Sequence, residues 1–245
     1  MRHNADVFFL MSFFFRVNFI SIQLSNLCFL SLALAVYPLN SNTRGRDISL
    51  SRNPAGRLGR VYPDRGPDGT NGGAYRFTGS VNSYIEFRNT GKLDTRKSLT
   101  LLAWIKHTGR SGPIFNYRPN GWGVHFWMTS HRQLFIKFTR RNGYQPPPVV
   151  YNHVKHGRWQ FVGATYNRNT GRAKLFVNNR FVAQRYIGRF QLATQYPVRM
   201  GAKNDRRDRR YFKGSISCMQ VYGKYLTRRQ ILSKKTRCFR KGTHF

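Results

Sequence analysis

Arginine is the residue type in this chain with the clearest binding chemistry, and it is concentrated near the C-terminus. The chain carries 43 Lys+Arg against 8 Asp+Glu, which gives a formal net charge of +35. One basic group, in a predicted loop before a strand, comprises Arg206, Arg207, Arg209, Arg210 and Lys213. A second group, on or beside a predicted helix, comprises Arg228, Arg229, Lys234, Lys235 and Arg237. Because a planar guanidinium donates two parallel hydrogen bonds to a sulfate or carboxylate, both groups are candidate anion-binding residues.

The size of the charge excess indicates a polyanionic partner, because self-repulsion among so many cations destabilises a compact state. Anionic glycans, acidic matrix proteins and nucleic acid are the classes that would neutralise it. No nucleic-acid-binding motif accompanies the basic residues, so nucleic acid is not expected as a partner. The alternative interpretation is a solvated basic surface that only keeps the protein soluble.

The scarcity of carboxylates argues against two function classes. Glu86 is the only glutamate, and no acidic residue follows it until Asp94. A glycosidase of the usual kind needs two carboxylates flanking the scissile bond, and a calcium cage needs several acidic ligands in one loop. The best calcium candidate, residues 204–208, contains Asp205 and Asp208 beside arginines that would repel a dication, so Asp–Arg pairing is favoured. Histidine and cysteine spacing predicts no metal site and no cofactor.

The N-terminal segment predicts export. It is largely apolar, and Ala33-Leu34-Ala35 supplies the small-x-small pattern that a signal peptidase needs. We therefore predict a signal peptide over residues 1–35 and a single secreted domain over residues 36–245. An uncleaved signal anchor is the alternative, because residues 17–36 are about long enough to span a bilayer. No second apolar stretch of membrane length follows.

Alternation of apolar and polar residues predicts short strands from Ala74 onward. Leu134 and Ile136 would share one face of a strand, and Asn178-Asn179 predicts a type I′ hairpin turn. Upstream, Pro63-Asp64 and 67–69 indicate turns. The pattern predicts an all-β fold in which two antiparallel sheets form one sandwich.

One short C-terminal helix and one disulfide complete the predicted elements. Thr227 and Gln230 fit a capping box before Ile231. Cys28 lies in the leader, which leaves Cys218, in a strand predicted over residues 212–222, and Cys238 beyond the helix. An exported chain with two cysteines is expected to form one disulfide, which would tie the helix to that strand.

Aromatic residues form a weaker candidate site over residues 120–127, which contain Trp122, Phe126 and Trp127. Their rings could stack on a sugar. Packing in the core is favoured, because tryptophan and phenylalanine are mostly buried.

Several segments together resemble the laminin G-like jelly roll of the concanavalin A-like lectin/glucanase superfamily. The matching segments are residues 36–40, 74–79, 84–87, 98–105, 159–166, 174–179 and 212–218, followed by Leu226-Thr227. The resemblance implies an extracellular jelly roll that recognises ligands. Calcium binding is possible by resemblance but is disfavoured by the few acids. The Glu-x-Asp-x-Glu strand of the glucanase branch is missing, so no enzymatic activity is expected.

We therefore expect a secreted, non-catalytic module that recognises heparin-like sulfated glycosaminoglycans or other polyanionic components of the extracellular matrix. The alternative is a structural or adhesion protein that binds acidic proteins without glycan specificity.

Overall fold

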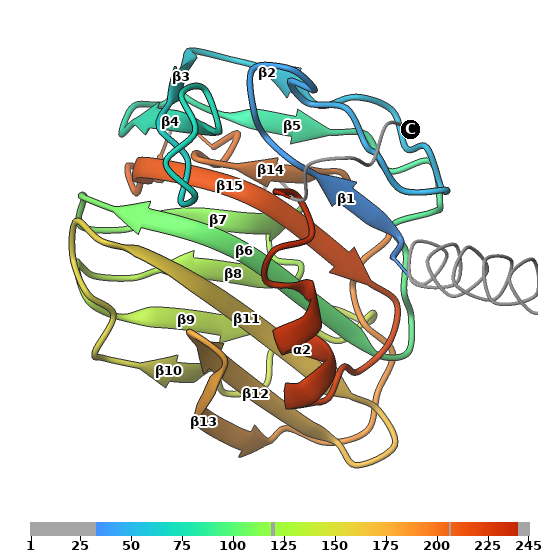
Figure 1. The fold of residues 1–245 in the computed structure, drawn as a ribbon. Helices are drawn as coiled ribbons and strands as arrows, with labels where there is room; N and C mark the ends of the chain where they lie inside the picture. Colours follow the sequence, from blue (N-terminus) through green and yellow to red (C-terminus); the bar gives the residue numbers. More distant parts are fainter. Residues whose placement is uncertain (1–32, 119–120, 206, 240–245) are drawn as a thin grey trace, which may run out of the picture.

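Two antiparallel sheets face each other in the computed structural model, which describes residues 33–118, 121–205 and 207–239 (Figure 1). The eight-stranded sheet has the order β13 (Arg180–Tyr186), β12 (Arg172–Val177), β11 (Trp159–Asn167), β6 (Leu99–His107), β15 (Lys213–Tyr222), β4 (Ala74–Thr78) and β3 (Val61–Asp64), with β1 (Ala35–Tyr37) also paired to β15. The seven-stranded sheet has the order β10 (Val149–Tyr151), β9 (Leu134–Lys137), β8 (His125–Met128), β7 (Gly112–Tyr117), β14 (Val198–Met200), β5 (Ile85–Phe87) and β2 (Arg57–Leu58). The predicted two-sheet sandwich is confirmed.

The main core lies between the sheets and is built by alternation along each strand. Leu134 and Ile136 of β9 are fully buried in it, as predicted, and Leu101 and Ile105 of β6 enter it from the other sheet. Burial of such side chains supplies the main favourable free energy of folding.

The β12–β13 hairpin turns at the predicted asparagines. Asn178 and Asn179 have φ values of 49° and 65°, the left-handed values that a type I′ turn requires at both central residues. The hairpin places β13 at one edge of the eight-stranded sheet.

The turn predicted at Pro63-Asp64 is wrong, because both residues belong to β3. β3 is the last strand of its sheet, so it has one neighbour, β4, with which Pro63 pairs opposite Tyr75. Proline lacks an N–H but is tolerated in an edge strand, where one side of the backbone has no ladder to complete. The turn predicted over residues 67–69 does form.

The predicted C-terminal helix is α2 (Arg228–Lys234), which packs on the outer face of the eight-stranded sheet (Figure 1). Its capping box is confirmed, since the Thr227 side chain accepts from the Gln230 N–H and the Gln230 side chain accepts from the Thr227 N–H. Ile231 is buried in a second apolar cluster outside the main core. The predicted disulfide joins Cys218 of β15 to Cys238 after the helix.

The predicted signal peptide falls mostly on residues 1–32, outside the part of the chain that is described. Its last residues enter the fold: the Leu34 N–H donates to the Val221 carbonyl at 2.8 Å, and Ala35 is fully buried in β1. The boundary after Ala35 therefore stays a prediction. No helix within the described residues is long and apolar enough to cross a membrane.

Candidate functional site

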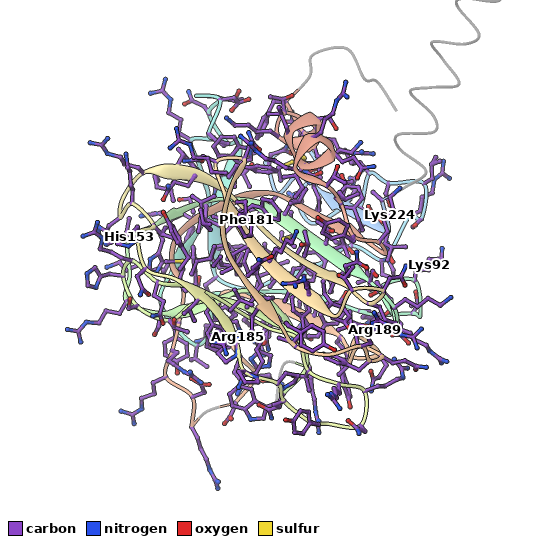
Figure 2. The ribbon with its side chains drawn as sticks, turned by 90° about the horizontal axis from the view of Figure 1, so that it is seen from below. Lys92, His153, Phe181, Arg185, Arg189 and Lys224 are labelled. Carbon is purple, nitrogen blue, oxygen red and sulfur yellow. A yellow bond between two sulfur atoms is a disulfide. The ribbon has the colours of Figure 1, made fainter. Side chains whose placement is uncertain are left out.

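The two predicted basic groups do not form one surface. The second group lies on α2 and the segment after it, on the outer face of the eight-stranded sheet. The described members of the first group lie in the connection from β14 to β15 and at Lys213, the first residue of β15. In Figure 2, α2 is at the upper side of the molecule and this connection is at the lower side. Arg206 lies outside the described residues.

Much of the helix group is used for packing. Lys234 is only 6% exposed, so it presents almost no surface to a ligand. The Lys235 ammonium lies 5.3 Å from the Trp104 ring centre, while the Lys235 carbonyl accepts from the Trp104 indole N–H at 2.9 Å. Arg228 donates to the Asn179 carbonyl at 2.8 Å.

Arg237 is also engaged within the fold. Burial raises the pKa of Tyr222 to about 12, and the contact of its hydroxyl with Arg237 opposes that rise. Arg229 and the outward part of Arg228 therefore remain the most accessible cations of the helix group.

Arg210 of the loop group is already paired with a carboxylate. Arg210 forms a bidentate pair with Asp208, with N–O distances of 2.8 and 2.7 Å. The buried Lys203 ammonium lies 3.3 Å from Asp208 and 3.7 Å from Asp205. Burial alone would raise the pKa of Asp208, but the bonds from Arg210 outweigh it and hold the pKa at about 2. The expected Asp–Arg pairing is thus confirmed for Asp208.

These carboxylates do not fit the calcium site that the family resemblance allowed. Each is already opposed by a cationic side chain, which would have to be displaced by the metal. Within the described residues, no group of three or more His, Cys, Asp or Glu side chains could hold a metal ion.

The aromatic segment builds a stack on the outer face of the seven-stranded sheet. The His125 ring stacks on Trp122 at 4.7 Å and on Trp127 at 5.5 Å between centres. Burial lowers the pKa of His125 to about 3, and nearby Lys203 adds to the shift. The predicted core packing holds for Phe126 and is wrong for Trp122, which is 41% exposed. A cleft of about 550 Å³ is lined by Trp122, Lys203, Asp205, Arg207, Asp208, Arg209 and Arg210.

A larger basic cleft lies at the end of the sandwich where β6 ends and β11 and β15 begin, at the left of Figure 1. It consists of two adjoining depressions of about 610 and 570 Å³ that share His131 and His156. Six cationic side chains line it, here called the cleft cations: Arg110, Arg132, Lys155, Arg158, Arg209 and Lys213. Within the described residues, no carboxylate lines either depression.

Hydrogen bonds between backbones hold the walls of this cleft together. The Gly157 N–H donates to the His107 carbonyl at 2.8 Å, which joins the β10–β11 connection to the end of β6. The Thr108 N–H donates to the Lys213 carbonyl at 2.9 Å, which joins the β6–β7 connection to β15. Figure 2 labels His153 in the β10–β11 connection, on the left side of that view. The cleft is therefore built on paired backbone at the ends of strands.

His107 lies buried beneath the cleft. Its ring is 1% exposed, 5.1 Å from the ring of Phe212 and 6.3 Å from that of His156. Burial lowers its pKa to about 4, a hydrogen bond with the His131 backbone opposes this lowering, and the neighbouring His156 adds to it. His107 is therefore neutral at physiological pH and contributes shape to the site rather than charge.

The cleft cations are available to an external anion. Among the described residues, none of the six forms an ion pair with a carboxylate. The contrast is Arg141, whose guanidinium is already held by Asp94. Guanidinium and ammonium groups without an internal counter-ion can donate charge-assisted hydrogen bonds to sulfate, phosphate or carboxylate.

Sequence reasoning found only Arg209 and Lys213 among these six. The others lie in three connections that are distant in the chain: β6–β7, β8–β9 and β10–β11. The dense basic run from His153 to Arg158 is the available signal in the sequence, but it lies outside the two basic groups near the C-terminus. Only the strand pairing shows that this run meets the β14–β15 connection.

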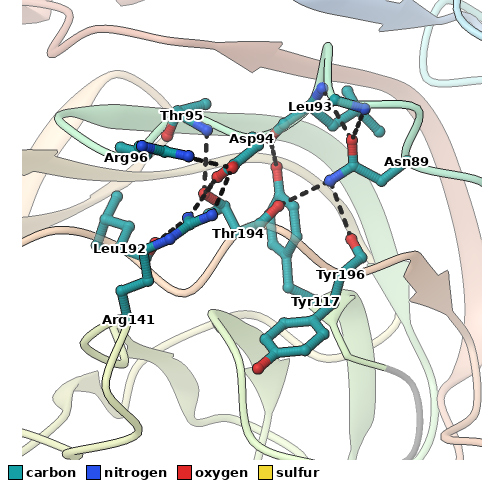
Figure 3. A network of polar contacts seen from close by, with 11 residues as sticks. Asn89, Leu93, Asp94, Thr95, Arg96, Tyr117, Arg141, Leu192, Thr194 and Tyr196 are labelled. Atoms are coloured by element: carbon teal, nitrogen blue, oxygen red, sulfur yellow. Dashed lines mark hydrogen bonds and ion pairs between the residues drawn. The ribbon is translucent and has the colours of Figure 1, made fainter.

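Away from the cleft, a network of polar side chains around Asp94 joins connections between strands of the sandwich (Figure 3). Asp94 accepts two hydrogen bonds from Arg141, at 2.9 and 2.8 Å, and one from the Thr194 hydroxyl at 2.8 Å. Asn89 donates to the carbonyls of Thr194 and Tyr196. The network ties three connections to one another, so we assign it a structural role.

Comparisons with known proteins give one family and a set of similar folds. The family model described as "Concanavalin A-like lectin/glucanases superfamily" matches residues 78–232. No curated protein matches the chain. The binding domain of Paraclostridial Mosquitocidal Protein 1 is similar, with a TM-score of 0.67 and 12% identity over 85% of this chain and 53% of that chain.

Two botulinum neurotoxin structures are similar at 14% identity. They are the serotype G binding domain, with a TM-score of 0.64 over 82% of this chain and 50% of that chain, and the serotype D ligand binding domain in complex with N-acetylneuraminic acid, with a TM-score of 0.65 over 84% and 51%. This chain thus spans about half the length of the structures it matches. At these identities the likeness shows the fold alone.

Proposed function

The chain belongs to the concanavalin A-like lectin/glucanases superfamily, and we propose that it is a non-catalytic, extracellular binding module for anionic glycans. The observation that carries this proposal is the basic cleft, where the six cleft cations surround open space and no described carboxylate competes for them. Heparin-like sulfated glycosaminoglycans are the ligand class we favour, because arginine forks match sulfate oxygens in geometry and charge.

Two further observations support a glycan ligand in an oxidising compartment. One similar solved structure contains N-acetylneuraminic acid, a sugar that carries a carboxylate. The Cys218–Cys238 disulfide is of the kind that persists in extracellular proteins.

The surroundings of Glu86 support a non-catalytic role. Its carboxylate lies 3.4 Å from Arg57 and 3.7 Å from Arg199, so cations rather than a second acid oppose it. Hydrolysis of a glycosidic bond by the common mechanism uses two carboxylates placed across that bond.

A second candidate function, binding of acidic proteins, is favoured by the exposed edge strand β13. Phe181 is 48% exposed and Tyr186 63% exposed there, beside the exposed Arg180 and Arg185. Figure 2 shows Phe181 and Arg185 on this strand. An exposed sheet edge can pair with an extended segment of another protein.

Isothermal titration with a heparin octasaccharide tests the first proposal. The variant R132E/R158E should weaken binding at least about tenfold, since each lost charge-assisted hydrogen bond is worth about 1.5–3 kcal/mol. The control R180E/R185E makes the same change in charge on β13 and should bind nearly as well as the wild type.

Equal losses in the two variants would show attraction by overall charge and would refute the cleft as the site. Competition with polyglutamate separates the two candidate functions. A glycan-specific cleft keeps the octasaccharide in the presence of equal carboxylate charge, whereas displacement by polyglutamate would show that the cleft binds polyanions without glycan specificity.

A further inference from the structure

The basic cleft has two halves of equal charge. One of the two depressions is lined by Arg132, Lys155 and Arg158. The other is lined by Arg110, Arg209 and Lys213, and the two depressions share none of these six cations. His131 and His156 line both. Each half therefore presents three cations, and the two histidines stand at the junction.

A single anionic group cannot satisfy both halves. One sulfate or carboxylate bound in either depression would leave the three cations of the other without a counter-ion. The repulsion between the halves is relieved only when both are occupied by negative charge. A ligand that crosses the junction meets His131 and His156, whose ring centres are 6.5 Å apart and whose planes are inclined at 76°.

We propose that the two depressions form one continuous groove for an extended polyanion with at least two anionic groups, and that His131 and His156 at its junction strengthen binding in acid. This inference rests on the proposed function and deepens it. The ligand class is an oligosaccharide chain with repeated sulfate or carboxylate groups, rather than a single acidic sugar.

The charges around the junction determine the sign of the acid effect. The groups that face His131 and His156 are the cleft cations, Tyr211 in the same wall, and the buried His107. A polyanion bound across the junction adds negative charge beside both rings, and by linkage a proton taken up there strengthens binding of the polyanion.

The size of the acid effect follows from Coulomb's law. One added unit charge at about 6 Å from a bound anionic group, in a water-like dielectric, gives about a threefold gain in affinity. Histidine changes charge between pH 5 and 8, so the gain should develop in that window. His107 does not contribute there, because burial lowers its pKa to about 4.

Titration of the full chain with two heparin fragments tests the continuous groove. The probes are a sulfated disaccharide and an octasaccharide, and the variants are R132S/R158S in one half, R110S/R209S in the other and R180S/R185S as a control on β13. We expect the wild type and the control to prefer the octasaccharide by about tenfold or more, and either cleft variant to lose most of that preference.

The outcomes separate this inference from the proposed function. If one cleft variant weakens both probes equally and the other changes nothing, the groove is a single subsite and the inference is overturned while the function stands. If the wild type binds neither probe, or all three variants lose binding alike, the proposed function fails as well.

The acid arm compares the wild type with H131Q/H156Q at pH 7.5 and 5.5. The wild type should gain about threefold or more for the octasaccharide on going from pH 7.5 to pH 5.5, and the glutamine variant should show no gain between the two pH values. A gain that persists in the glutamine variant, or its absence from the wild type, would overturn the role of the histidines. Thermal melting of each variant shows that the fold is retained.

Discussion

Replacement of Asp94 by Asn tests how the connections of the sandwich are held. The Asp94 carboxylate is 15% exposed and binds both terminal nitrogens of Arg141, whose side chain is 26% exposed. It also accepts a hydrogen bond from Thr194. The amide in D94N has nearly the same shape but no charge, and one of its two terminal atoms is a donor facing the Arg141 donors.

The expected loss of stability follows from these contacts. Removal of one partner from a buried ion pair costs about 3–5 kcal/mol, and the partial exposure of this pair reduces the loss to about 2–3 kcal/mol. For a domain of this size that loss lowers the melting temperature by roughly 5–10 °C.

The pH dependence has a defined sign. Burial alone would raise the pKa of Asp94, but the hydrogen bonds from Arg141 and Thr194 outweigh it, so the pKa lies below its usual value. A carboxyl group with a lowered pKa in the folded state stabilises the fold above its unfolded-state pKa, and this stabilisation is lost as the pH falls through the folded-state pKa. The difference in stability between the wild type and D94N should thus begin to shrink below about pH 4 and disappear only below the folded-state pKa of Asp94.

Urea unfolding at pH 7 and at pH 3.5 measures both effects. The control is D68N, because the bonds that Asp68 makes to other described residues are confined to Thr70 in its own exposed turn. D68N should change the free energy of unfolding by less than about 0.5 kcal/mol. If D94N were no less stable than D68N at pH 7, or if its loss were the same at both pH values, the assigned role of the Asp94 network would be wrong.

Three other predictions concern the helix, the disulfide and the cleft. T227A removes the capping side chain of α2 and should cost about 1 kcal/mol, measured by urea unfolding, with Thr170→Ala in an exposed turn as the control. The double variant C218S/C238S should lose about 3 kcal/mol, and reduction should destabilise only the wild type; equal sensitivity of both to reductant would contradict this. In G109V the new Cβ would lie 2.9 Å from the Lys213 Cβ, so Lys213 must move and octasaccharide affinity should fall; unchanged affinity would mean that this wall is not part of the site.

Local patterns were sufficient to predict most of the fold. The alternation in β9, the two asparagines of the β12–β13 turn and the Thr227–Gln230 capping box each encode their structure within a few residues. The exception at Pro63 arises because edge strands tolerate proline, and a position at the edge of a sheet is not visible in the sequence.

The binding cleft was less predictable for a physical reason. Basic residues were grouped by closeness in the chain, but the cleft is assembled by strand pairing from connections far apart in sequence. Lys234 shows the opposite error: it lies in a basic run, yet its position on α2 turns it toward the sheet and buries it. Trp122 differs from the expected core packing because its segment stacks on the outer face of the seven-stranded sheet.

Chemical-shift mapping of the isotope-labelled protein with the heparin octasaccharide tests the proposed site most directly. The largest shifts should fall on backbone amides around the cleft, at Gly109, His131, Lys155 and His156, with little change along α2. Shifts centred on Arg228 and Arg229, or spread evenly over the basic surface, would contradict binding in the cleft.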